Sequence, residues 1–405
     1  MRDNNFSFER MIDPVGEDTF LREYWDQKPL VIERGKPDHY AGVLSMADID
    51  AIVGFRQLKY TQLKIARAEH AQPDKVFYVD SDSTSDTNRL FHSYDQGDTV
   101  VLNFAQCYWE PAARLCAALE NFFHFPAGVN VYVTPRNSQG FPPHFDSHDV
   151  FVLQVEGAKS WRIYPAREAM PCGIEDSQPI PRERLGAPLR ACRLTAGDLL
   201  YLPRGYVHEA HATDASSVHV TVGVRSFTWT DLLSEMLAAA SQENLELQKA
   251  LPVGFMNSQE AVGLMADRLP ELIRTLTDSG RIESSIGRLR ERLIARKRPL
   301  PDAHFRSLDQ VDQIDLDTVV AKREGMMCYV SRKPDCVDIA FPGNRMRGPV
   351  DIETAFRFIA DAKEAFPVRA LPAIVSDESK LVLARRAIRE GLLTILSLEA
   401  AQQKA

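Results

Sequence analysis

The chain has 405 residues, of which 44% are hydrophobic and 26% are charged, and its formal net charge is −8. This length exceeds what one hydrophobic core usually serves, so two or three domains are expected. The acidic balance argues against a protein that coats nucleic acid, because phosphate neutralisation requires a basic face. No stretch reaches the roughly 18 apolar residues of a membrane span, and an apolar signal region is missing from the first residues.

Cysteine usage bears on the compartment. The six cysteines form no C-x-x-C pair and lack the density of a disulfide scaffold. We therefore expect a reducing, cytoplasmic location.

Helices are predicted ahead of a strand-rich region, at residues 14–24, 45–53 and 111–123. The last of these begins with a proline, which suits the first turn of a helix. The strand-rich region follows and extends to about residue 228. Its loops 69–91 and 166–194 are the places where a substrate could be recognised.

The most informative segment is PPHFDSHDVFVLQVEGAKSWRIY at residues 142–164, which places His144 two residues before Asp146. Side chains two apart share one face of a strand, so both can point into one cavity. Residues 150–156 read as a strand, and 157–159 as a tight turn into a second strand. We therefore expect a hairpin to carry both side chains.

A third polar group follows in GDLLYLPRGYVH, which ends at His208. Pro203 and Gly205 predict that the strand stops there, leaving His208 at the mouth of a barrel rather than inside a ladder. Two imidazoles and one carboxylate can hold one face of a ferrous ion and leave the other open. An isolated H-x-D motif is usually only a hydrogen-bonded pair, so the hypothesis of a non-haem iron oxygenase depends on this context.

Other histidines could compete for the metal by residue type alone. His219 lies in an alternating strand pattern, and packing or a hydrogen bond to a ligand fits it better than ligation. We expect His211 and His148 to lie near the site and to face solvent.

The strand-like pattern ends at residues 228–231, which resemble the N-terminal capping sequence of a helix. An alanine-, leucine- and glutamate-rich helical stretch follows and extends to residue 251. Helical patterns recur at 258–277 and 281–297. The second ends in a basic run at 288–298. Such a run is most often a solvated face near a helix C-terminus, and docking to an RNA or an acidic partner is the alternative. A proline-bearing link at 299–305 suggests a boundary.

The last region predicts strands at 326–331 and 337–341 and helices at 352–365 and 377–390. Residues 315–405 hold 14 Lys and Arg against 13 Asp and Glu. This balance gives no strong electrostatic footprint for nucleic acid.

In its motifs the chain resembles the JmjC-type 2-oxoglutarate oxygenases and, within them, the ribosomal oxygenases. The resemblance implies an α+β fold with a double-stranded β-helix (jelly-roll, cupin-like) barrel, bound Fe(II), 2-oxoglutarate as co-substrate and O2. The motifs that carry it are YWxxKPLVI at 24–32, NVYVTP at 130–135, QGFxPHFDxHD at 139–149, QxxGxKxW at 154–161, and GD with LPxGxxH at 197–208.

The resemblance also assigns roles to residues. His144, Asp146 and His208 match the iron ligands, and Lys159 matches the residue that pairs with the distal carboxylate of 2-oxoglutarate. A cation at this position can neutralise a dicarboxylate that already chelates the metal. Tyr132 and Asn130 match positions that line the co-substrate pocket.

The same resemblance implies a JmjC catalytic domain with N-terminal helices at 1–228, a helical dimerisation region at 229–300, and a winged-helix-like domain at 301–405. A homodimer is expected, since twofold dimers are the commonest closed oligomers. A winged helix suggests DNA binding by analogy, but the charge balance favours a role in supporting the catalytic dimer or presenting substrate.

The predicted function is hydroxylation of an amino-acid side chain of a protein, with an arginine or histidine of a ribosomal protein as the favoured substrate. Alternatives are a hydroxylase of a biosynthetic peptide or small metabolite, and a non-enzymatic cupin-type binding or regulatory protein with a DNA-binding winged helix. The enzyme is favoured because His144, Asp146, Lys159 and His208 are all present.

Overall fold

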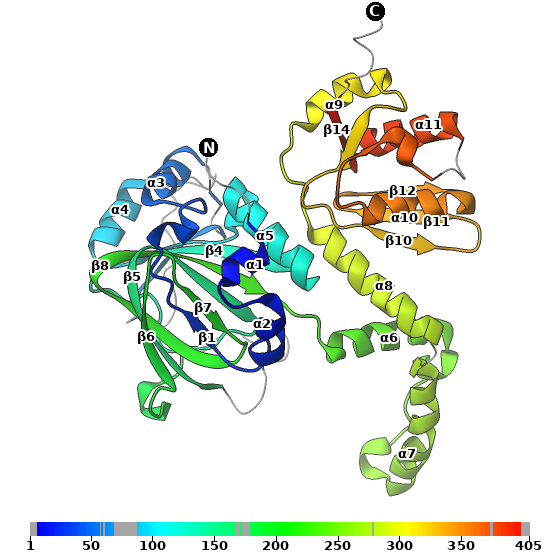
Figure 1. The fold of residues 1–405 in the computed structure, drawn as a ribbon. Helices are drawn as coiled ribbons and strands as arrows, with labels where there is room; N and C mark the ends of the chain where they lie inside the picture. The colour runs from blue at the N-terminus through cyan, green and yellow to red at the C-terminus, as the bar shows by residue number, and fades with distance from the viewer. Residues whose placement is uncertain are drawn as a thin grey trace, which may run out of the picture. The chain divides into compact units, whose positions relative to one another are not determined.

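The structure is a computed structural model of the chain, which divides into two compact units, Met1–Ser226 and Phe227–Ala405 (Figure 1). Each unit has a hydrophobic core of its own. The loops predicted to face the substrate lie partly outside the residues that the structure describes. These described residues are 6–56, 58–59, 61–68, 87–166, 171, 179–277, 279–372 and 376–397.

The first unit is built on an antiparallel sheet with the strand order β1-β7-β5-β8-β4-β3-β2, and β6 pairs with β5 outside this path (Figure 1). The long strands β5 and β8 form its centre and pair along most of their length. The strands are β1 (Leu30–Ile32), β2 (Leu63–Ala66), β3 (Thr99–Leu102), β4 (Ala127–Thr134), β5 (Asp149–Ala166), β6 (Arg190–Thr195), β7 (Leu199–Leu202) and β8 (Tyr206–Val224).

Strand β8 shows why the sheet has two unlike faces. Val218, Val220 and Val222 are buried in the core of the first unit. Because side chains alternate along a strand, His219 and Thr221 point to the opposite face, where they line a cavity. The predicted strand character of His219 is confirmed.

Helices cover the valine face of this sheet through an aromatic cluster. Phe8 stacks on Phe122 with ring centroids 4.2 Å apart, and Phe20 meets Tyr201 edge-on at 4.9 Å. Such contacts bury large apolar areas with defined geometry, so the cavity lies on the other face. The helices are α1 (Phe8–Ile12), α2 (Glu17–Glu23), α3 (Met46–Phe55), α4 (Thr87–Asp95) and α5 (Glu110–Phe123).

The expected hairpin turn at Gly157 is wrong. Strand β5 continues through this glycine, and the pairing of β5 with β8 shifts register between Gly157 and Lys159. Gly157 has a φ of +65°, which marks a β-bulge that bends one strand instead of reversing it. A single strand therefore pairs with β8 on both sides of the bulge.

The second unit begins with helix α6 (Trp229–Glu243), whose capping box joins Thr228 and Asp231 as predicted. The helical stretch expected to reach residue 251 ends earlier. Asn244 accepts a hydrogen bond from the Glu246 backbone N–H at 3.0 Å, which caps a short 3-10 turn and so stops the α-helix. Two further helices follow, α7 (Gln259–Arg274) and α8 (Ser279–Arg296).

Two three-stranded sheets with helices complete the second unit, with strand orders β10-β11-β12 and β13-β9-β14. The predicted elements at 337–341, 352–365 and 377–390 are confirmed, with helix ends within a few residues. The elements are α9 (His304–Gln310), β9 (Val319–Lys322), β10 (Tyr329–Arg332), β11 (Val337–Phe341), β12 (Asn344–Gly348), α10 (Glu353–Asp361), β13 (Phe366–Pro367), α11 (Asp377–Arg389) and β14 (Leu393–Ser397).

Several arginines of the basic run in α8 make ion pairs and ring contacts within the second unit. Arg288 and Arg292 both pair with Glu235 of α6, at 3.2 and 3.1 Å. Arg290 lies over the ring of Tyr329, 5.0 Å from its centroid. These contacts hold α8 against its neighbours, so the run is more than a solvated face. Among the described helices, none is both long and apolar enough to cross a membrane.

Candidate metal centre

The two candidate histidines are paired through their backbones. The His144 N–H donates to the His208 carbonyl at 3.1 Å, and the His208 N–H donates to the His144 carbonyl at 2.8 Å. On its other side, His208 is paired with Ile163 of β5. His208 therefore lies inside a ladder, and its expected position outside one is wrong, because β8 begins at Tyr206, directly after the turn that follows β7.

The backbone of Asp146 is hydrogen-bonded to the turn between β7 and β8. The Gly205 N–H donates to the Asp146 carbonyl at 2.9 Å. His144 and Asp146 precede β5, which begins at Asp149, so a loop braced against β8 carries them rather than a hairpin strand.

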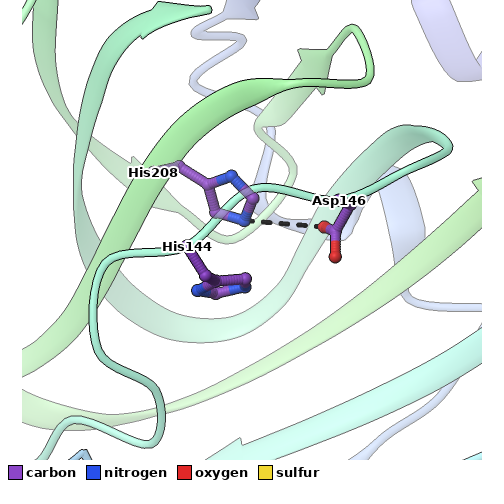
Figure 2. Close-up of side chains that lie close together, drawn as sticks. All are labelled: His144, Asp146 and His208. Atoms are coloured by element: carbon purple, nitrogen blue, oxygen red, sulfur yellow. Dashed lines mark ion pairs between the residues drawn. The ribbon is translucent and has the colours of Figure 1, made fainter. Parts of the chain in front are cut away.

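The three side chains converge, as Figure 2 shows. Their potential ligand atoms all lie within 4.8 Å of one another. His208 Nε2 lies 3.6 Å from Asp146 Oδ2, and the rings of His144 and His208 have centroids 4.4 Å apart. Two imidazoles and a carboxylate on one side of a cavity fit a metal ion that keeps open positions.

Backbone carbonyls set the tautomer of both imidazoles. His144 Nδ1 lies 2.8 Å from the Pro142 carbonyl oxygen, and His208 Nδ1 lies 3.0 Å from that of Tyr206. A carbonyl can only accept, so each Nδ1 carries the hydrogen and each Nε2 keeps its lone pair. This arrangement orients ligating histidines in metalloproteins.

The charge states also suit a cation. Burial, followed by the nearby His144, lowers the pKa of His208 to about 4. Burial alone would raise the pKa of Asp146, but the His208 and His144 imidazoles outweigh it and the pKa is lowered. At neutral pH the site thus holds a neutral His208 and an ionised carboxylate, the protonation states that metal binding requires.

A cavity of about 180 Å³ opens beside these groups. Val150 and Val152 give it an apolar wall, while polar side chains, among them the three candidate ligands and Lys159, line the rest of it. Polar groups that converge on a cavity are typical of a binding site. It is lined by Tyr132, Gly140, Phe141, His144, Asp146, Val150, Val152, Lys159, Trp161, His208, Ala210, His219 and Thr221.

Lys159 is the buried cation of this cavity, with only 4% of its surface exposed. Its Nζ donates to Thr134 Oγ1 at 2.9 Å, and among the described residues no carboxylate pairs with it. Burial lowers its pKa to about 7. A buried ammonium group without a counter-ion is unfavourable, so the cavity is suited to an anion.

The two remaining predicted pocket residues differ in placement. Tyr132 lines the cavity, and burial, then Asp146, raises its pKa, so it stays a neutral hydrogen-bond donor. Asn130 is not among the lining residues; its Oδ1 accepts from the Phe104 N–H at 3.1 Å. Phe104 has a φ of +56°, and Asn130 thus supports a left-handed backbone position.

Some lining residues carried no prediction, among them Trp161, Thr221 and Phe141. Alternation along β5 and β8 would place Trp161 and Thr221 once the register of the two strands was known. His211 pairs with Ser160 on β5 and does not line the cavity. His148 packs beside Gly223, where a Cβ would come within 2.6 Å of its Nε2.

The chain is similar to several known proteins. Residues 103–232 match the JmjC domain. The chain is 34% identical over 262 residues to the bifunctional lysine-specific demethylase and histidyl-hydroxylase NO66 of Aedes aegypti, which covers 61% of this chain and 40% of that protein. It is 33% identical over 304 residues to ribosomal oxygenase 1 of Gallus gallus, covering 69% of this chain and 49% of the relative. The chain thus spans less than half the length of these two relatives.

Solved structures share the fold. YcfD, a ribosomal oxygenase from Escherichia coli in complex with cobalt and 2-oxoglutarate, superposes with a TM-score of 0.55 and 18% sequence identity, covering 94% of this chain and 98% of that one. The antiparallel sheet is consistent with the cupin-like core that the resemblance implied. The chain therefore belongs to the JmjC-domain family, in the group that includes the ribosomal oxygenases.

Proposed function

We propose that this chain is an Fe(II)- and 2-oxoglutarate-dependent oxygenase that hydroxylates an amino-acid side chain of a protein. One observation carries the proposal: a single cavity holds both the convergent His144, Asp146 and His208 and the buried Lys159. The first set suits ferrous iron with an open face. The lysine suits the far carboxylate of a dicarboxylic co-substrate.

Each of the three candidate ligands would have a defined role at the iron. His144 and His208 would each offer Nε2 to the iron, held in direction by their Nδ1 hydrogen bonds. Asp146 would offer one carboxylate oxygen. When bound, iron with 2-oxoglutarate and O2 supplies the oxidising power to hydroxylate a C–H bond, chemistry that side chains lack.

The rest of the cavity would bind and shield the co-substrate. Lys159 would neutralise its distal carboxylate, and Tyr132 would add a neutral O–H donor beside it. The walls formed by Val150 and Val152 keep water away from the reacting groups. Asn130 would act indirectly, by fixing the backbone next to the strand that carries Tyr132.

We propose a ribosomal protein as the substrate, hydroxylated on an arginine or a histidine in the cytoplasm. Support comes from the names of the two relatives, ribosomal oxygenase 1 and the bifunctional lysine-specific demethylase and histidyl-hydroxylase NO66. The net charge of −8 would favour encounter with a basic ribosomal protein.

For the chain as a whole we propose a catalytic region at 1–228, a helical dimerisation region at 229–300 and a winged-helix-like region at 301–405. Several apolar side chains of the middle region are exposed to solvent: Trp229 is 80% exposed, Leu233 54% and Leu237 48%. Their spacing places them on one face of α6, and a contiguous apolar face is typical of an interaction surface. A second copy of the chain is the proposed occupant.

The test is anaerobic loading of the full chain with Fe(II) and 2-oxoglutarate, then exposure to oxygen with purified ribosomes. Succinate release together with a ribosomal protein heavier by one oxygen atom is the expected result. The variant His144→Ala should abolish both signals, whereas His211→Ala, outside the cavity, should retain them. Absence of iron-dependent succinate from the loaded chain, with ribosomes and with peptide substrates, would show that the proposal is wrong.

A further inference from the structure

A third histidine, His219, belongs to the cavity without belonging to the metal centre. It is 3% exposed and lines the cavity. Within the described residues, the group that can share one metal ion is His144, Asp146 and His208. His219 is therefore placed for another role.

Two aromatic side chains hold the His219 ring in place. Tyr132 stacks on it almost in parallel, with centroids 4.7 Å apart and planes 4° apart. Trp161 meets it nearly edge-on at 5.7 Å and 76°. Trp161 also lies near His208, with ring centroids 6.0 Å apart. The wall of the cavity thus runs from the metal ligands through Trp161 to His219.

Hydrogen bonding is incomplete along this wall. In the described part of the chain, His219 Nδ1 and Trp161 Nε1 are buried without a hydrogen-bond partner. Native structures leave few buried polar atoms unsatisfied, so each such atom calls for an explanation, such as a bound water or ion or a role in catalysis. Lys159, with one neutral partner, lies in the same cavity.

The charge of His219 fits an auxiliary donor rather than a second counter-ion. Burial, followed by the nearby Lys159, lowers the pKa of His219 well below its ordinary value. The ring is therefore neutral and carries one N–H. A neutral donor beside Lys159 can add a hydrogen bond to an anion without adding a second buried charge.

We propose that His219 binds the co-substrate, donating a ring N–H to the carboxylate that Lys159 neutralises, with the Trp161 indole N–H as a further donor on the same wall. This inference rests on the proposed function, because that function supplies the dicarboxylate. A competing explanation is a bond within the protein. Gln154 lies opposite His219 in the β5–β8 pairing, and its Oε1 also lacks a partner.

The experiment measures binding without turnover. The full chain is loaded with Mn(II), oxygen is excluded, and 2-oxoglutarate is titrated by calorimetry. His219→Phe keeps a flat ring against Tyr132 and removes both nitrogens, so the dissociation constant should rise about 10-fold or more, as expected when a hydrogen bond to a charged group is lost. His211→Phe, on the same strand outside the cavity, is the matched control and should leave it unchanged.

A second ligand separates direct contact from a change of pocket shape. 2-Oxobutanoate keeps the 2-oxo acid group and lacks the far carboxylate, so His219→Phe should not alter its affinity. His219→Gln retains an N–H donor and should bind 2-oxoglutarate more tightly than His219→Met, a comparison that remains available if the Phe variant does not fold.

The outcomes are distinct. If His219→Phe binds 2-oxoglutarate as the unaltered chain does, or weakens both ligands equally, His219 does not contact the carboxylate and the inference is wrong. If the unaltered Mn(II)-loaded chain does not bind 2-oxoglutarate at all, the proposed function itself is wrong.

Discussion

Arg204 donates through Nη1 to Asp149 Oδ2 at 3.3 Å, and this ion pair joins the two segments that carry the candidate metal ligands. Asp149 directly follows the loop of His144 and Asp146, and Arg204 lies in the turn before His208. Asp149 is fully buried and also accepts from the Tyr201 and Ser226 hydroxyls, both at 3.0 Å. The pair is therefore part of the support of the metal centre.

Removal of this carboxylate should loosen the centre. In Asp149→Ala, the Arg204 guanidinium loses its buried partner and two hydroxyls lose an acceptor, so the free energy of unfolding should fall by about 3 kcal/mol. Mn(II) affinity should fall by about 10-fold, as is typical when a group that orients ligands is lost. Urea unfolding and Mn(II) titration measure the two effects. Asp214→Ala, at an exposed pair with Arg193, is the control; equal losses in both variants would contradict this role.

Lys159 should dominate co-substrate affinity. Lys159→Met removes the buried positive charge, and the dissociation constant of 2-oxoglutarate should rise by about 100-fold or more, because a buried carboxylate is left unpaired. Lys159→Arg keeps the charge and should retain part of the affinity. Calorimetry with the Mn(II)-loaded chain measures both. An unchanged affinity in Lys159→Met would remove Lys159 from the pocket.

The lowered pKa of Lys159 predicts how stability depends on pH. Burial moves the pKa from its ordinary value of 10.5 to about 7, so between these values the unfolded chain binds more protons than the folded chain. Stability rises with pH in that window. Without ligand, the loss in free energy of unfolding caused by charged, buried Lys159 should be fully present below about pH 7 and disappear toward pH 10.5. Subtracting the unfolding profile of Lys159→Met isolates this contribution, and a difference that does not change between pH 7 and 10.5 would refute it.

The same shift predicts proton uptake on binding. A bound carboxylate stabilises charged Lys159 and raises its pKa again. Above about pH 7, 2-oxoglutarate binding should therefore take up a proton, and affinity should decrease as the pH rises. Titrations in two buffers of different ionisation enthalpy measure this uptake, which should be absent in Lys159→Met.

The sequence predicts the metal centre better than its surroundings. His144 and Asp146 are two residues apart and so stay close together even though a loop carries them, and the structure brings both next to His208, as predicted. Helix α5 and the capping box of α6 also follow from local signals. The helix and the capping box depend on residues close together in the chain, whereas His208 was predicted from the turn that precedes it.

Features that depend on long-range pairing could not be predicted. A glycine between two alternating stretches suits either a hairpin turn or a bulge, and only pairing with β8 decides for the bulge at Gly157. The same applies to His219, whose alternation shows a strand but not which face lines the cavity. His208 was expected beyond the ladder because Pro203 and Gly205 end β7, yet the next strand begins at once.

The bulge at Gly157 gives a stability test. A Cβ there would lie 1.8 Å from the Ser216 carbonyl oxygen, and its φ of +65° is strained for other residues. Gly157→Ala should therefore lower the free energy of unfolding by roughly 3 kcal/mol, the scale of a backbone clash. Gly186→Ala, where nothing lies within 4 Å of the added carbon, should change it by less than about 0.5 kcal/mol. Urea unfolding decides, and a Gly157→Ala variant as stable as Gly186→Ala would contradict the bulge.

The proposed dimer predicts a matched pair of variants. Leu233 and Leu237 lie one turn apart on α6 and are 54% and 48% exposed, so a charge at both should be tolerated by a monomer and excluded from an apolar interface. Light scattering should give twice the chain mass for the unaltered protein and the single mass for the doubly substituted Leu233→Asp and Leu237→Asp chain. Val382→Asp, on α11 and 59% exposed, should remain dimeric. A monomeric unaltered chain at micromolar concentration, or a double variant that still dimerises, would show that this face of α6 is not the interface.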